Sequence, residues 1–74
     1  MPKLPPVSGQ EAIRTLQKLG FFQARQRGSH VVLRHPDGRG CVVPNHRELK
    51  VGTLAGILRQ AGIGVDEFIH ARSE

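Results

Sequence analysis

Apolar residues recur at helical spacing from residue 8 to residue 19, and both ends of this segment carry the signals of helix termini. Ser8 and Glu11 have the spacing of a capping box, in which each side chain accepts a hydrogen bond from a free amide of the first turn. Gly20 follows the last apolar position and is a common helix stop. The stripe that would face a core consists of Ala12, Ile13, Leu16 and Leu19.

The pattern then changes to short apolar runs separated by turn residues, which is typical of strands. The three predicted strands are residues 21–26, 29–35 and 40–43, and the second is rich in β-branched valine. Turns are predicted at residues 27–28 and at residues 36–38, a Pro-Asp-Gly sequence. Because the connections are so short, consecutive strands should pair antiparallel.

A polar loop at residues 45–50 leads to a second helical pattern at residues 52–61, which Gly62 should end. A short final helix is predicted at residues 66–71. Residues 1–7 contain three prolines and are expected to form an extended lead-in to the first helix.

The order of elements is therefore α-β-β-β-α plus a short C-terminal helix, which predicts an α+β fold and a single domain over residues 1–74. The three-stranded antiparallel sheet should be covered on one face by the two helices and open on the other. This is the layout of a double-stranded-RNA-binding domain. Strand alternation puts His30, Val32 and Arg34 on one face, and we expect this more polar set to face the open side unless a bulge follows Gly28.

Charge and cysteine content narrow the class of protein. Eleven Lys and Arg against six Asp and Glu give a net charge of +5. This excess favours nucleic acid as a partner, although a basic surface kept for solubility is the plainer alternative. Cys41 is the only cysteine, so no internal disulfide is expected and a cytoplasmic location is predicted. No apolar run approaches the ~18 residues of a membrane span, so no membrane association is expected.

Few residue patterns along the chain offer chemistry. The four histidines lack the spacing of a zinc site and one cysteine cannot build a cysteine-rich cage, so neither a metal nor a cofactor is predicted. No phosphate-binding glycine loop, dinucleotide fingerprint or nucleophile elbow is present. What remains is a basic segment made of Arg25, Gln26, Arg27, Gly28, Ser29 and His30.

This segment has the residue types that RNA cleavage needs. Arg25 and Arg27 can hold phosphates through forked hydrogen bonds, and Gly28 lets a backbone approach a ligand closely. The imidazole of His30 suits proton transfer near neutral pH. RNA supplies its own nucleophile, the 2′-hydroxyl, so one histidine with nearby cations could do part of the reaction without a metal. The plainer alternative is that His30 is a half-exposed hydrogen-bonding residue at a strand start.

Two other positions are candidates for RNA contact. His46 lies in the loop before the second helix and is a candidate substrate contact. Lys50 with Thr53 could bind a phosphate, because free amides at a helix start favour anions. Ordinary capping of the second helix explains these two residues equally well.

Several segments carry a resemblance to a known family. In chain order they are Gly20-Phe21, residues 25–30, residues 35–38, Val43-Pro44, Leu49-Lys50, residues 52–54 and residues 57–62. Over about residues 8–70, the chain thereby resembles the HicA toxin family, also described as YcfA-like. The resemblance implies a fold like that of a double-stranded-RNA-binding domain and a toxin that cleaves mRNA. It also implies a HicB antitoxin as partner, which blocks the active site.

The family's Gly-Ser-His motif falls on Gly28, Ser29 and His30, so the resemblance implies that His30 is catalytic. Val31 departs from the family, because many relatives have a second polar or basic residue there. This departure weakens the case for the strand as a broad RNA-contact surface. Gly56, inside the second helix, should cost about 1 kcal/mol relative to alanine.

The leading hypothesis is a metal-independent endoribonuclease, the toxin of a type II toxin–antitoxin system, which is a monomer when free. The residues expected to act are His30 in catalysis and Arg25, Arg27, Gly28, Ser29, His46 and Lys50 in RNA binding. A non-catalytic RNA-binding module with the same fold is the alternative. A third hypothesis is a protein-interaction domain whose basic face meets an acidic partner.

Overall fold

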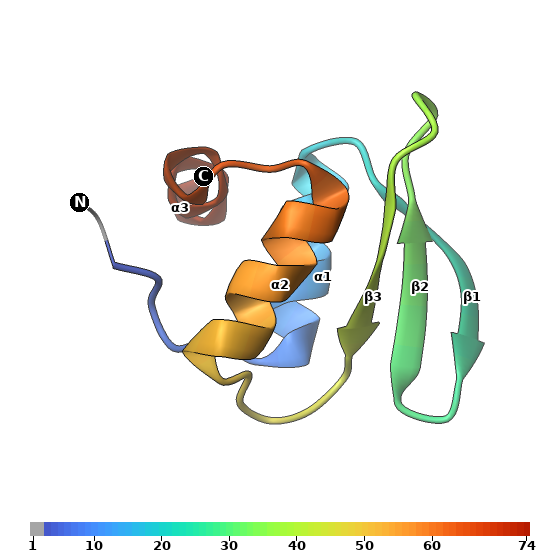
Figure 1. Ribbon diagram of the computed structural model, residues 1–74, viewed down its shortest axis with the longest axis horizontal. Helices are drawn as coiled ribbons and strands as arrows, with labels where there is room; N and C mark the ends of the chain where they lie inside the picture. The colour runs from blue at the N-terminus through green and yellow to red at the C-terminus, as the bar shows by residue number, and fades with distance from the viewer. Residues whose placement is uncertain (1–2) are drawn as a thin grey trace.

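The computed structural model describes residues 3–74, and the α+β fold predicted from the sequence is confirmed (Figure 1). Two residues of the expected lead-in, Met1 and Pro2, lie outside the described residues. The end of that lead-in is held against the body, because Val7 is buried and forms an isolated antiparallel bridge with Leu49. The elements in chain order are α1 (Gly9–Lys18), β1 (Phe22–Arg27), β2 (His30–Arg34), β3 (Gly40–Pro44), α2 (Val51–Ala61) and α3 (Val65–Ser73).

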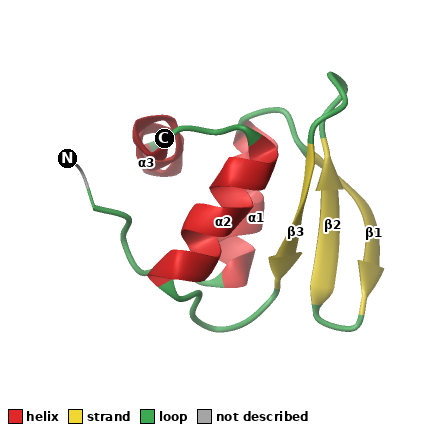
Figure 2. Cartoon of the chain, in the orientation of Figure 1, coloured by secondary structure: helices red, strands yellow, loops and turns green. Residues whose placement is uncertain are grey.

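The three strands form one antiparallel sheet in the order β1-β2-β3, as predicted from the short connections. All helices lie on the same side of this sheet, with α1 and α2 against β3 and β1 farthest from the helices (Figure 2). The expectation that the helices cover a whole face of the sheet is wrong for β1, because all six of its residues are exposed. Two short helices are wide enough to cover β3 and β2 only.

Burial alternates along the two inner strands, as a half-covered sheet requires. Val31 and Leu33 of β2 and Cys41 and Val43 of β3 point toward the helices and are buried. The intervening Val32 is only half-buried. The expected orientation of β2 is therefore confirmed, because His30, Val32 and Arg34 face away from the helices.

The start of α1 has the capping box that its sequence predicts. The Ser8 hydroxyl accepts a hydrogen bond from the Glu11 amide at 3.0 Å, and the Glu11 carboxylate accepts one from the Ser8 amide at 3.3 Å. The Ser8 amide holds the pKa of Glu11 below its usual range, and the nearby Arg72 guanidinium adds to this effect. These contacts fix where α1 begins.

Helix α3 is longer than predicted and belongs to the core. Phe68 is completely buried, which stabilises the fold by about 1.5–3 kcal/mol. The Lys18 ammonium donates to the Ala71 carbonyl at 3.3 Å, and Arg72 pairs with Glu11 at 3.3 Å. Helix α3 therefore closes the side of α1 that the sheet leaves open. No helix within residues 3–74 has the length and apolar content needed to cross a membrane.

Arg39 fastens the β2–β3 turn to the C-terminal end of α2. Its guanidinium donates to the carbonyls of Ala61 at 3.0 Å and Gly62 at 3.3 Å, and to the Asp37 carboxylate at 2.8 Å. It also lies 5.5 Å from the centre of the Phe21 ring. A cation suits this place because the last carbonyls of a helix carry partial negative charge.

Gly9 brings the loop after β3 into direct contact with the start of α1. Its amide donates to the His46 carbonyl at 2.8 Å. A Cβ at this position would lie 2.7 Å from the Asn45 Cα and 2.9 Å from the His46 amide nitrogen, and would also meet the Pro44 carbonyl. All of these are backbone atoms, which cannot rotate away, so the close approach requires glycine.

We therefore expect Gly9→Ala to lower the free energy of unfolding by about 1–3 kcal/mol, because the added methyl group overpacks a rigid contact. Urea unfolding followed by circular dichroism measures this change. The matched control is Gly56→Ala, since a Cβ at Gly56 meets only the Arg59 guanidinium at 3.9 Å. That variant should gain up to about 1 kcal/mol from helix propensity. Equal effects of the two variants would contradict the requirement for glycine at residue 9.

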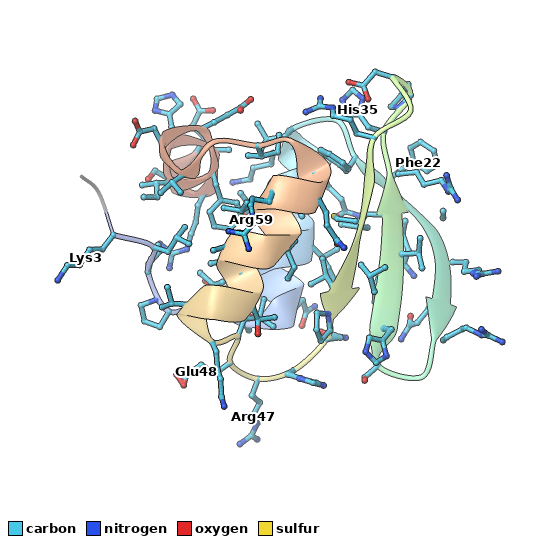
Figure 3. All side chains as sticks on the ribbon, in the orientation of Figure 1. Lys3, Phe22, His35, Arg47, Glu48 and Arg59 are labelled. Atoms are coloured by element: carbon cyan, nitrogen blue, oxygen red, sulfur yellow. The ribbon has the colours of Figure 1, made fainter. Side chains whose placement is uncertain are left out.

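Removing the Arg39 side chain should loosen the far end of the sheet from α2. Arg39→Ala should lower the free energy of unfolding by about 1–2 kcal/mol, because charge-assisted bonds to helix carbonyls are lost. Thermal unfolding at low and high salt is the measurement, with Arg47→Ala as the control. Arg47 is exposed in the β3–α2 loop and points away from the body in Figure 3. A control as destabilised as Arg39→Ala would refute a specific role for the Arg39 contacts.

Candidate functional site on the open face of the β1–β2 hairpin

A two-residue turn, Gly28-Ser29, sets the geometry of the candidate site. Arg27 pairs directly with His30, so the turn is one residue later than the predicted Arg27-Gly28. Gly28 has φ 55°, whereas no residue other than glycine has positive φ in the described chain. A positive φ at the first turn position only is typical of the type II′ hairpin turn, which matches the twist of the strands.

The register then places the candidate catalytic histidine between two known neighbours. His30 pairs with Arg27 of β1 on one side and with Pro44 of β3 on the other. Arg25 pairs with Val32, the next residue of β2 on the same face. Directly paired residues of antiparallel strands point to the same side of a sheet. His30, Arg25 and Arg27 therefore share the face that the helices leave uncovered.

A β-bulge in β1 is essential to this arrangement. The register shifts between Gln23 and Arg25, which leaves Ala24 as the extra residue. As a result Phe22 and Arg25 both pair with residues of the uncovered face, although their spacing in the sequence is odd. The bulge lies in β1 and not after Gly28, so the expected orientation of His30 is retained.

We call the uncovered side of the sheet the open face. Its members are Phe22, Arg25 and Arg27 of β1, His30, Val32 and Arg34 of β2, and Gly40, Val42 and Pro44 of β3. None of them is acidic. Val32 and Val42 form an apolar centre, and three guanidinium groups and one imidazole lie on its β1 and β2 sides. Figure 3 shows Phe22 beside the sheet, away from the helices. Such a surface attracts polyanions and offers apolar area to a partner.

Two contacts from outside the open face support the turn. The Asn45 amide donates to the Ser29 carbonyl at 2.6 Å, so the loop after β3 is tied to the hairpin. The Gln26 side-chain amide donates to the Gly28 carbonyl at 3.0 Å. Neither contact follows from residue type, because both depend on the register of the strands. The contact of Gln26 could have been predicted from the sequence only if the turn had been assigned to Gly28-Ser29.

The other predicted RNA-binding residues, His46 and Lys50, lie at the same end of the molecule as the turn but do not belong to the open face. His46 follows Pro44 by two residues, and its side chain is exposed. Lys50 is the N-cap of α2, where no side chain caps the helix, so the first-turn amides are open to an anion. In Figure 1 the β1–β2 turn, the β3–α2 loop and the start of α2 share one end.

Other reactive groups are scarce near the site. Cys41 lies beneath the sheet, 5% exposed, and burial raises the pKa of its thiol to about 11. A protonated, buried thiol is a poor nucleophile, and Cys41 serves as a small apolar residue of the core. Within residues 3–74, no three His, Cys, Asp or Glu side chains gather closely enough to hold a metal ion. His30 is thus the only His, Cys, Asp or Glu side chain among the residues of the open face.

Comparison with known proteins gives the family of the chain. The sequence profile described as the HicA toxin of bacterial toxin–antitoxin systems matches residues 9–63, which span α1, the whole sheet and α2. Among curated proteins, none matches this chain. The profile covers well over half of the chain, including the turn, the open face and the loop after β3. The chain therefore belongs to the HicA toxin family of bacterial toxin–antitoxin systems.

Proposed function

We propose that this toxin is an endoribonuclease that cuts mRNA on the open face, with His30 as the group that transfers the proton. The observation that carries the proposal is the direct cross-strand pairing of His30 with Arg27, both of which are exposed. An imidazole that can take a proton thus lies beside a cation that can hold a phosphate. The surface also has no carboxylate to repel RNA.

The reaction that these groups support uses the 2′-hydroxyl of the RNA. His30 accepts the proton of that hydroxyl, and the 2′-oxygen forms a bond to the adjacent phosphorus. The bond from phosphorus to the 5′-oxygen of the next nucleotide breaks, and that oxygen takes a proton from the imidazolium or from water. The products are a 2′,3′-cyclic phosphate and a free 5′-hydroxyl. Arg27 stabilises the extra negative charge on phosphorus in the transition state.

The remaining predicted residues would bind the RNA backbone on either side of the cut. Arg25 extends the cationic row from Arg27, and the exposed turn at Gly28-Ser29 lets the RNA approach closely. Lys50 and the uncapped first turn of α2 offer a second place for a phosphate at the same end of the fold. His46 lies between these two places along the chain.

As a member of a toxin family, the protein has an antitoxin as partner. We propose that this antitoxin is of the HicB type and covers the open face, where it hides His30 and pairs acidic side chains with the arginines. The apolar centre at Val32 and Val42 would supply the dry part of that interface. The single buried thiol suits a reducing compartment, so we place both proteins in the cytoplasm.

His30→Ala should lower the rate of RNA cleavage about 10²–10⁴-fold, the usual contribution of a positioned acid or base. The measurement is single-turnover decay of labelled RNA with a chelator present throughout. His70→Gln is the matched control, because His70 is an exposed histidine of α3 that faces Glu74. His30 is exposed as well, so the variant should keep its circular dichroism spectrum and unfolding temperature.

Undiminished cleavage by folded His30→Ala would refute the catalytic assignment. Loss of cleavage by the chelator alone would refute metal independence. Wild-type protein that binds RNA and never shortens it would instead support the non-catalytic RNA-binding module.

Arg25 and Arg27 should contribute to RNA binding mainly through charge. In the His30→Ala background, each arginine-to-alanine change should reduce the slope of log affinity against log salt by about 0.7–1. Arg59→Ala is the control, because Arg59 lies on the exposed surface of α2, away from the open face (Figure 3). Equal slopes for all three variants would mean that the open face does not bind the RNA backbone.

A further inference from the structure

A polar groove lies on the opposite side of β1 from His30, between that strand and α1. Its volume is about 280 Å³, which suits one small planar group better than a drug-sized ligand. The groove exists because no helix packs on β1, so the strand and α1 stand apart. The polar residues that line it are Gln10, Arg14 and Gln17 of α1, Gln23 and Gln26 of β1, and Asn45 of the β3–α2 loop.

The chemistry of this lining is unusually uniform. Five of its polar groups are carboxamides, one is a guanidinium, and none is a carboxylate. A carboxamide presents a donor beside an acceptor, and a guanidinium presents paired donors. Both patterns match the hydrogen-bonding edges of bases. With one positive charge only, the groove is poorly suited to a run of phosphates. It is suited to a neutral, hydrogen-bonding ring.

Most of these groups are free to bind a ligand. Within residues 3–74, the side chains of Gln10, Arg14, Gln17 and Asn45 form no hydrogen bonds with other protein groups. Their spacing along α1 is four and then three residues, so Gln10, Arg14 and Gln17 form one stripe that faces the strand. On the β1 side of the groove, the side-chain amide of Gln23 donates to the side-chain oxygen of Gln26 at 3.4 Å.

Two residues of the groove also hydrogen bond to the turn beside His30. Gln26 holds the Gly28 carbonyl through its side chain, and Asn45 holds the Ser29 carbonyl through its backbone amide. Gln26 pairs with Val31, the residue after His30, but points to the other side of the sheet. A ligand in the groove therefore lies on the opposite side of the sheet from the open face and contacts the residues that support the turn.

We propose that this groove is the subsite that reads one base of single-stranded RNA next to the cut, and so sets the sequence preference of the toxin. The inference rests on the proposed ribonuclease function. The RNA passes around the turn, with the scissile phosphate at His30 and Arg27 on the open face. A neighbouring base enters the groove, where Gln17 and Gln23 hydrogen bond to its edge.

The test compares a groove variant, Gln10→Ala with Gln17→Ala, with the wild-type chain on a random RNA pool, where sequencing maps the 5′ ends. Alanine is the best helix former, so α1 should keep its stability. In the variant, the preference at one position beside the cut should fall about tenfold, because the amides that hydrogen bond to the base are lost. Gln60→Ala removes an amide of α2 outside the groove and should keep the wild-type preference.

A second arm separates this inference from the ribonuclease proposal. In the His30→Ala background, short RNAs that differ in one base are titrated and followed by fluorescence anisotropy, with and without the groove changes. Base discrimination that the groove changes abolish supports the subsite even where no cleavage occurs. Discrimination that is unchanged, or absent from the wild-type groove, overturns it. So does a variant that keeps its base preference and only escapes inhibition by the antitoxin, which would make the groove a protein contact.

Discussion

The two-residue turn Gly28-Ser29 sets the register of the β1–β2 hairpin and thereby decides which side chains lie on the open face. A hairpin loop of two residues allows one register only, and that register pairs Arg27 with His30. A one-residue slip would move His30 to the helix side of the sheet and replace it with a valine. The bulge at Ala24 then returns Phe22 to the open face. The chemistry of the open face thus follows from backbone geometry as much as from side-chain identity.

The uneven cover of the sheet has a functional consequence. Strands β2 and β3 are anchored through buried residues such as Leu33 and Val43, and β1 is joined to them by its pairing with β2. Strand β1 contributes no buried residue and displays a different surface on each side. One side carries arginines and the other carries glutamines. The bulge and the charged side chains also protect this free edge from pairing with other strands, a common device in natural sheets.

Much of the fold follows from local sequence signals. The capping box at Ser8, the left-handed cap at Gly62 and the alternation along Val31, Val32 and Leu33 each predict what is observed. The exposure of β1 does not follow from them, because it depends on how wide a layer α1 and α2 make. The full burial of Phe68 is also a property of the assembled helices, since α3 alone is weakly amphipathic. In the site, residue types predict a basic segment that ends in His30, whereas the pairing of Arg27 with His30, the bulge and the contacts of Gln26 and Asn45 depend on the register.

We propose that the RNA provides the nucleophile and that His30 takes its proton. The most direct measurement uses an RNA with one 2′-deoxy nucleotide on the 5′ side of a mapped cleavage site. We predict that the wild-type protein no longer cuts this bond, while neighbouring sites are cut as before and leave 2′,3′-cyclic phosphates. Cleavage of the deoxy-substituted bond at the original rate would contradict this mechanism, because the attacking oxygen would then come from elsewhere.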